Sequence, residues 1–160
     1  MEYVALGAGL LAILTVLAII WLRRPRAVSI ERARRAFDEQ HSALEHEFFA
    51  AASASGKPRG LRWKACELGP GVELARDRRS GELLALAPVT ISFEAIAGSD
   101  MEGLPAVGNL RSASAVFAWR DGRWITAGRA VFNLDPAEAI RHFRNQYEPV
   151  GPEVGENTAN

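Results

Sequence analysis

Cysteine and histidine are scarce in this 160-residue chain, and its formal net charge is zero. The single cysteine, Cys66, excludes an intrachain disulfide and suits a reducing compartment. His41 and Glu45 are four residues apart, so that a helix could direct both toward one metal ion. Zinc needs three or four ligands, and the sequence places neither His142 nor Cys66 near this pair. We therefore expect no metal and no cofactor.

Basic residues are few in the distal part of the chain. Residues 23–64 carry ten Lys or Arg against five Asp or Glu, whereas residues 65–160 carry nine against thirteen. A nucleic-acid-binding domain presents a basic surface across its folded part, because contacts to phosphates supply most of its affinity. The charge distribution therefore argues against a nucleic-acid partner.

Catalytic motifs are absent as well. The chain contains neither Gly-x-Ser-x-Gly nor Ser-x-x-Lys, and no glycine-rich phosphate loop that ends in Gly-Lys-Ser or Gly-Lys-Thr. Cys66 lies between Lys64 and Glu67, but a free cysteine is more often a small buried side chain than an activated thiol. We assign no catalytic residue, and the sequence favours a protein that is not an enzyme.

One long hydrophobic run is present, at residues 3–22. As a helix this uncharged stretch rises roughly 30 Å, which is about the hydrocarbon thickness of a bilayer. A secretory signal has a basic start, a shorter apolar core and a small-residue cleavage site, and the run lacks all three. Residues 1–22 are therefore predicted to be a retained transmembrane anchor.

The flanks of this run predict its orientation. Arg23, Arg24 and Arg26 follow the anchor in a basic juxtamembrane linker, residues 23–28, and Trp21 suits the membrane interface. Positively charged flanks stay in the cytoplasm. We expect a single-pass protein with its N-terminus outside and its C-terminal domain in the cytoplasm.

Two further partners follow from the same region. Six arginines lie between residues 23 and 35, and such a cluster attracts anionic lipid headgroups. Ala5 with Gly9, or Ala8 with Ala12, has the small-xxx-small spacing that could form a weak homodimer through the anchor.

The next stretch has the period of a helix. Ser29 is a suitable N-cap, and apolar residues then recur on one face, with charged pairs on the other. The apolar set is Ile30, Ala33, Phe37, Leu44, Phe48 and Ala51. One long amphipathic helix is predicted, ending near Gly56 and Pro58.

From residue 61 the period changes to two, which predicts antiparallel strands. The run at 83–96 is strongly strand-like, and Pro88 within it suggests a bulge or a sheet edge, because proline donates no hydrogen bond. Residues 97–110 form a loop longer than usual. Asp121-Gly122 then predicts a tight type I′ hairpin that brings Trp119 opposite Trp124.

A short helix closes the domain. Asp135 as N-cap, Pro136 at the first helical position and Glu138 at the third form a capping arrangement. The proline-rich and glycine-rich acidic tail, residues 148–160, is predicted to be disordered. The soluble domain is therefore expected to span residues 29–147.

The predicted class is α+β: an N-terminal transmembrane helix, then a long amphipathic helix packed on a four- to five-stranded antiparallel sheet, with a short C-terminal helix. This order of elements resembles the cystatin or nuclear-transport-factor-2-like plan, in which a curved sheet wraps a helix. The resemblance covers residues 29–147 and implies a fold, not an activity.

The sequence allows two functions. The first is a small cytoplasmic, non-catalytic interaction or adaptor domain held at the membrane and bound by a protein partner of unknown identity. The alternative is a membrane-tethered pocket that binds a small ligand or catalyses a simple proton transfer, with His41 or Asp100 as base. His41, Trp63, Trp119 and Trp124 are the candidate partner or pocket residues. A filled core with an exposed apolar patch favours the first, and a deep cavity favours the second.

Overall fold

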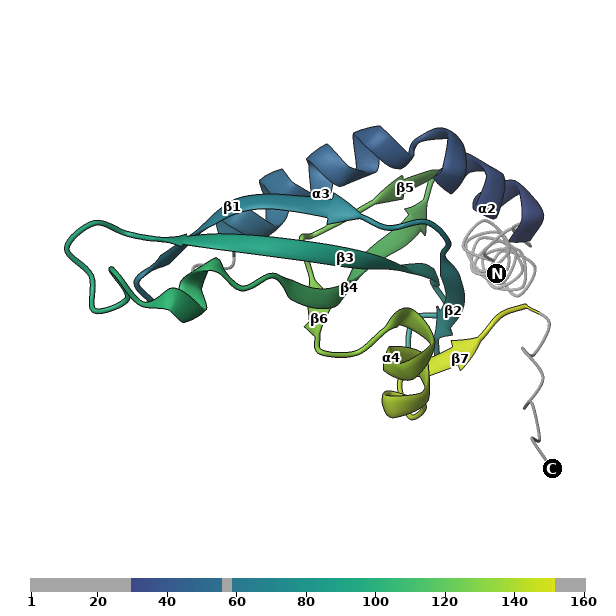
Figure 1. Cartoon of the computed structure of the whole chain (residues 1–160). Coiled ribbons are helices and arrows are strands. Elements are labelled where there is room, and N and C mark those ends of the chain that lie inside the picture. Colours follow the sequence, from purple (N-terminus) through teal and green to yellow (C-terminus); the bar gives the residue numbers. More distant parts are fainter. Residues whose placement is uncertain (1–29, 56–58, 152–160) are drawn as a thin grey trace, which may run out of the picture.

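The apolar stripe at the start of the domain folds as two helices, α2 (Ile30–Glu39) and α3 (His41–Ser55) (Figure 1). The predicted single helix is interrupted at Gln40, whose backbone N–H lies 3.2 Å from the carbonyl oxygens of both Ala36 and Phe37. The break lets the two halves take different directions over a twisted sheet while each keeps its apolar side buried.

The computed structural model describes residues 30–55 and 59–151. In these two ranges no helix has the length and apolarity to cross a membrane. The expected anchor at 1–22 and the basic linker at 23–28, with Trp21, Arg23, Arg24 and Arg26, lie outside the described residues. The proposed cap Ser29 and residues 152–160 do as well.

Seven strands form one sheet, and every strand pair in it is antiparallel. The strands are β1 (Leu61–Leu68), β2 (Glu73–Asp77), β3 (Leu83–Ala95), β4 (Arg111–Arg120), β5 (Arg123–Ile125), β6 (Ala130–Phe132) and β7 (Tyr147–Pro149). The order is β5-β4-β3-β2-β7, with β1 also paired to β3 and β6 also paired to β4. A 3₁₀ helix, η1 (Pro105–Gly108), and a helix, α4 (Pro136–His142), complete the fold.

The α+β class with an antiparallel sheet is confirmed, but the predicted strand count of four to five is too low. The segment after the Asp121-Gly122 turn is divided into β5 and β6 at residues 126–129, where Gly128 lies against the backbone of α3. A further strand, β7, pairs with β2 through Tyr147 and Pro149. The sheet therefore continues past residue 147, because the backbone of Val150 still donates to Leu74 O at 2.8 Å.

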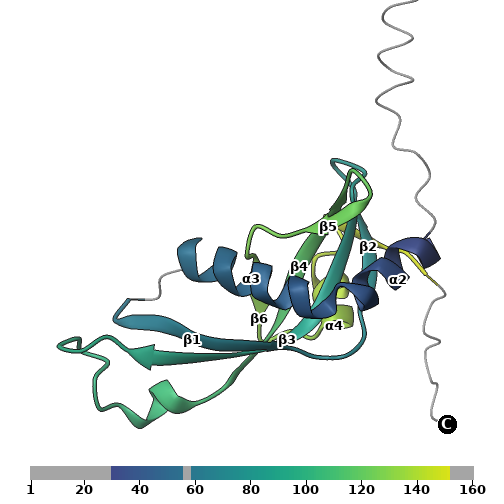
Figure 2. The same ribbon diagram turned by 90° about the horizontal axis from the view of Figure 1, so that it is seen from above.

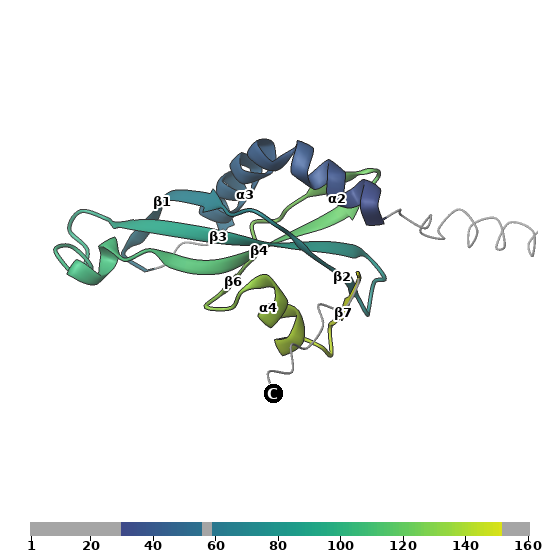
Figure 3. The ribbon, with the colours of Figure 1, turned by 45° about the vertical axis from the view of Figure 1, so that its right-hand side comes forward.

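The sheet is covered on both faces. Helices α2 and α3 lie across one face and α4 lies on the other (Figures 1 and 3). Side chains of β3 alternate between them, so that Ala85 and Ile91 join the core under α2 and α3, whereas Leu84 and Leu86 join the core under α4. Both groups are buried.

Aromatic side chains fill the larger core. Phe37 of α2 makes edge contacts with Phe117 and Trp124, at ring-centroid distances of 5.2 and 5.7 Å. Trp124 Nε1 donates a buried hydrogen bond to Ala33 O at 2.8 Å, which ties α2 to β5. Such a buried donor needs a partner, because leaving it unpaired would cost about 1 to 3 kcal/mol.

The smaller core lies under α4. Ala139 and Ile140 of the helix pack with Tyr147 of β7 against Leu84 and Leu86 of β3. Burial raises the pKa of the Tyr147 phenol, and the Arg129 guanidinium, 5.7 Å from the ring centroid, opposes that shift. The predicted capping box is present, since Asp135 and Glu138 each accept from the backbone N–H of the other.

The predicted tight hairpin is also present. Asp121 and Gly122 both have positive φ, at 51° and 81°, as a type I′ turn requires. Arg120 pairs with Arg123 and Trp119 with Trp124, whose rings meet at a centroid distance of 5.1 Å.

Pro88 lies neither at a bulge nor on an edge strand. Its pairing with Ser114 of β4 continues the register without a shift. On the other side Pro88 falls where β3 changes neighbours, from β2 at residues 83–86 to β1 from residue 89 onward. Its carbonyl accepts from Gly69 N at 2.8 Å. The N and C=O of one residue point to the same side of an antiparallel strand, so the nitrogen of Pro88, which has no hydrogen to donate, also faces the gap between β1 and β2. No ladder hydrogen bond is lost there.

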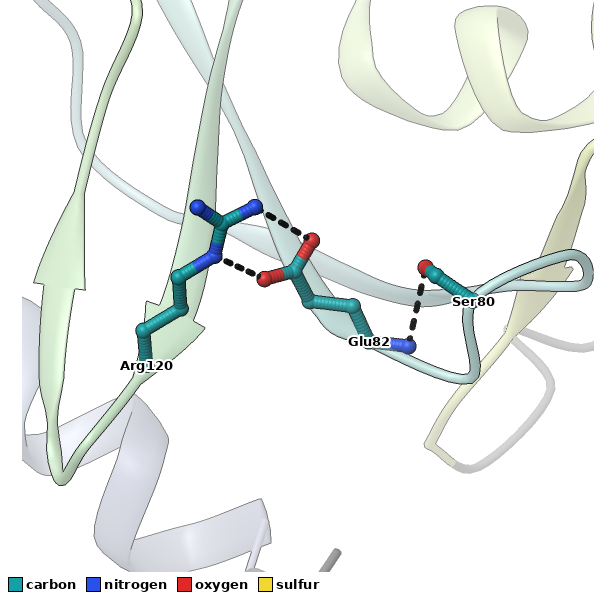
Figure 4. A network of polar contacts seen from close by, with 3 residues as sticks. All are labelled: Ser80, Glu82 and Arg120. Atoms are coloured by element: carbon teal, nitrogen blue, oxygen red, sulfur yellow. Dashed lines mark hydrogen bonds and ion pairs between the residues drawn. The ribbon is translucent and has the colours of Figure 1, made fainter. Parts of the chain in front are cut away.

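Two turns at one end of the sheet are joined by an ion pair. Arg120, at the end of β4, donates from two guanidinium nitrogens to the carboxylate of Glu82, which precedes β3 (Figure 4). The backbone N–H of Glu82 donates to Ser80 Oγ at 3.3 Å. Since Arg120 is exposed, solvent screens the pair, and it orients the turns more than it stabilises the fold.

Replacement of Gly128 by alanine should destabilise the domain more than the matched change Gly81→Ala. Both glycines have a φ of +73°, so both variants carry the strain of a left-handed residue, about 1 kcal/mol. At Gly81 an added Cβ meets nothing within 4 Å, whereas at Gly128 it would lie 2.2 Å from Ala52 N. We expect about 2 kcal/mol or more of extra loss for Gly128→Ala in urea unfolding of the full chain. Equal losses would show that α3 does not press on this loop.

Candidate functional site

The three tryptophans selected from the sequence do not form one site. Trp124 is 2% exposed and packs in the core with Trp119 beside it. Trp63 lies on β1, where it contacts Phe93 and Phe48 at centroid distances of 5.1 and 6.2 Å. The structure brings Trp119 and Trp124 into direct contact. Ring contacts through Phe37, Phe117 and Phe48 connect this pair to Trp63, so the three tryptophans belong to one packed core and line no common pocket.

His41 lies at the start of α3, half-buried. Its Nε2 donates to Gly69 O at 3.3 Å when that nitrogen carries the proton, and its ring meets the edge of Phe37 at a centroid distance of 6.5 Å. The other candidate base, Asp100, lies beside Gly60, just before β1, whereas Gly69 follows the end of β1. The two candidates therefore lie at opposite ends of that strand and cannot act on one substrate together.

Metal ligands are not clustered in the parts of the chain that the structure describes, where no three His, Cys, Asp or Glu side chains converge. Glu45, the predicted companion of His41, instead accepts a hydrogen bond from the backbone N–H of Leu68 at 2.8 Å. That bond attaches α3 to the end of β1.

Cys66 faces α3 and is half-buried. Burial, with a smaller contribution from the negative charge of Glu45, raises the pKa of its thiol to about 11. The group is therefore protonated near neutral pH, which is the opposite of an activated nucleophile.

The best candidate site is a groove that the sequence did not indicate. It has a volume of about 460 Å³, is open to solvent, and lies on the face that carries α3. Its lining comes from four strands, the 97–110 loop and the turn after β6: Leu61, Phe93, Val107, Arg111, Phe132 and Asn133. Large apolar side chains are exposed in the loop and strand segments that form this end of the sheet: Ile96, Leu104, Leu110 and Phe132.

Hydrogen bonds within the 97–110 loop and to residues beside it hold the loop in place. Ser99 Oγ donates to Gly60 O at 3.0 Å, and Glu102 accepts from the backbone N–H of Gly98 at 2.7 Å. The 3₁₀ helix η1 then returns the chain to β4, and its Ala106 carbonyl accepts from Arg111 at 3.3 Å. These contacts give the groove a fixed wall.

The electrostatics of the groove are simple. Arg111 is its one charged lining residue, and within the described ranges no carboxylate lies at ion-pair distance from it. An exposed cation beside apolar side chains suits a ligand that carries both apolar surface and a carboxylate. Asn133 closes the far side, with a φ of 61° that turns the chain out of β6.

Two sequence features could have pointed to this end of the molecule. The 97–110 loop is unusually long, and it contains Leu104 and Leu110 with no helical or strand period to bury them. The contribution of Phe132 could not be found, because it depends on the separation of β6 from β5.

No family model, curated protein or solved structure matches this chain. The candidate site therefore rests on its own geometry.

Alkylation of Cys66 by iodoacetamide at pH 8 should be about 100-fold slower in the folded chain than in urea, because a rise of the thiol pKa from 9.0 to about 11 lowers the thiolate fraction by that factor. Glu45→Gln should speed the reaction, since it removes the charge that opposes the thiolate and keeps an acceptor for Leu68 N. The control is Glu47→Gln on the exposed side of α3. A folded rate equal to that in urea, or the same rise in both variants, would contradict this assignment.

Proposed function

We propose that this chain is a single-pass membrane protein whose cytoplasmic domain is a non-catalytic interaction or adaptor module that binds a protein partner. The observation that carries this proposal is the open groove of mixed lining, with four apolar side chains and Arg111 as its one charge, bordered by exposed large apolar side chains. Exposed apolar surface with a polar rim is typical of a protein-binding surface.

The alternative of a ligand pocket has less support. Both faces of the sheet are filled by packed side chains, and the groove is open rather than enclosed. A small-molecule site usually encloses most of its ligand and directs a few polar groups into it. The buried polar side chain of Ser114 is already bonded to Leu134 O at 2.8 Å, on the α4 face of the sheet.

The shape of the domain is consistent with a tether. Ile30, where the described chain begins, and the 97–110 loop lie at opposite ends of the molecule (Figures 1 and 2). If residues 1–22 anchor the chain as their composition predicts, the groove faces away from the attachment point. Arg32 and Arg35 of α2 are exposed at the near end, where anionic headgroups would stabilise them.

The likeness to the cystatin or nuclear-transport-factor-2-like plan belongs to the same proposal. Helices that precede an antiparallel sheet and cover one of its faces support it. It carries no statement about activity.

A photoreactive amino acid at Leu110, which is 67% exposed, should cross-link the full chain to one cytoplasmic protein in its native cells. The same probe at Arg79, in the β2–β3 turn, should not. Because Arg111 supplies the charge, Arg111→Glu should remove at least about nine-tenths of the adduct, and Arg79→Glu should leave it unchanged. Adducts that ignore Arg111, or a captured protein from outside the cytoplasm, would overturn the proposal.

A further inference from the structure

We propose that the partner binds as an extended peptide strand that adds to the free edge of β6, with an apolar side chain in the groove and a carboxylate on Arg111. This inference rests on the proposed function, because it states how the groove is occupied. It is carried by the backbone of β6, by the closure of the other sheet edges and by the charge of the groove.

The register of β6 leaves backbone groups unpaired. Asn133 N donates to Ser112 O at 3.0 Å and Val116 N donates to Arg129 O at 2.9 Å. The positions bonded to β4 are therefore 131 within β6 and its two flanking residues, 129 and 133. In an antiparallel ladder the residues between them direct their N–H and C=O groups to the opposite side. Ala130 and Phe132 therefore present two donors and two acceptors at the edge.

Several features hinder the pairing of an added strand with the long edge of β1. Its outward N–H at Leu68 is already bonded to Glu45 of α3. A bulge between Trp63 and Ala65 breaks its register, and exposed charges such as Lys64 and Glu67 line it. Such features protect natural edge strands from further pairing.

The two remaining edges are also unsuitable. The outward residues of β7 include Pro149, which has no N–H to donate. β5 is three residues long and lies against α2, to which the Trp124 indole is bonded. β1 also borders the groove, through Leu61, but among the described edges beside the groove β6 is the one with neither a bulge nor a proline.

The side chains at the edge of β6 also suit an extended peptide. Phe132 pairs with Ala113, two residues from Arg111, so Phe132 and Arg111 share the face that carries the groove. A residue of an added strand opposite Phe132 would place its side chain on that face, at the mouth of the groove. The residue two positions further along the added strand would meet Arg111. The expected partner segment therefore has an apolar residue and an acidic residue at positions i and i+2.

A strand three residues long provides only a few hydrogen bonds, so the groove must supply part of the affinity. An amphipathic helix could also fill an apolar groove, but it would satisfy its own backbone and leave the β6 donors unpaired. The free edge therefore favours the extended occupant.

The test uses the full chain in detergent micelles and a six-residue acetylated and amidated peptide, Thr-Leu-Val-Glu-Val-Thr, whose Leu and Glu share one face. Fluorescence anisotropy measures the Kd of this peptide and of two N-methylated copies, one methylated at positions 2 and 4 and the other at 3 and 5. Only one alternate set of N–H groups faces β6, so one copy should bind about tenfold more weakly or worse and the other almost unchanged.

A second part of the experiment reverses the charge at position 111 and on the peptide. Arg111→Glu should raise the Kd of the Glu peptide by about tenfold or more and lower the Kd of a copy with Lys in place of Glu. Arg79→Glu should leave both Kd values unchanged. A hydrocarbon-stapled helical copy should bind more weakly than the extended peptide.

The proposal is overturned if no peptide of this panel binds, if both methylated copies bind alike, or if the helical copy binds best. In each of those cases, an Arg111-dependent cross-link at Leu110 would still support the proposed interaction function, and only binding by strand addition would be rejected. Loss of that cross-link as well would remove the function itself.

Discussion

Strand β3 is buried on both faces over residues 83–87, and the positions of the other elements depend on it. It pairs with β4 along most of its length and divides its other side between β2 and β1. Its odd-numbered residues are apolar from Leu83 to Phe93, and α2 with α3 covers them. On the other face α4 covers Leu84 and Leu86. Beyond them that face carries Thr90, Ser92 and Glu94, which are only partly buried. Pro88 is tolerated in this central strand because its missing donor falls where the neighbour changes.

β4 likewise divides its outer side, between β5 and β6, and this division produces the free edge on which the proposed function depends. A sheet of short strands has many ends, and each must be covered, interrupted or paired. Glu45 accepts the outward N–H of Leu68 in β1, Pro149 removes a donor from the outer edge of β7, and α2 lies over β5. β6 has none of these protections, and it lies beside a groove lined by apolar side chains and by Arg111, which has no carboxylate partner among the described residues.

Features set by neighbours in sequence were predictable, and features set by distant contacts were not. Asp121-Gly122 needs only its own φ preferences to form the hairpin, and the Asp135 capping box closes within one turn. The division of β5 from β6 depends on Gly128 meeting α3, and β7 depends on pairing with β2. Neither contact follows from the local sequence pattern. The long 97–110 loop marks this end of the molecule, but the contribution of β6 to the groove could not be predicted.

The openness of β6 is the central claim, and amide hydrogen exchange in the full chain tests it most directly. The N–H groups of Ala130 and Phe132 should exchange at rates close to those of an unfolded peptide, because they face solvent. Val131, which bonds to β4, and Leu68, which bonds to Glu45, should be protected by about 100-fold or more. Protection of Ala130 and Phe132 equal to that of Val131 would show that the edge is already covered, and would contradict the account.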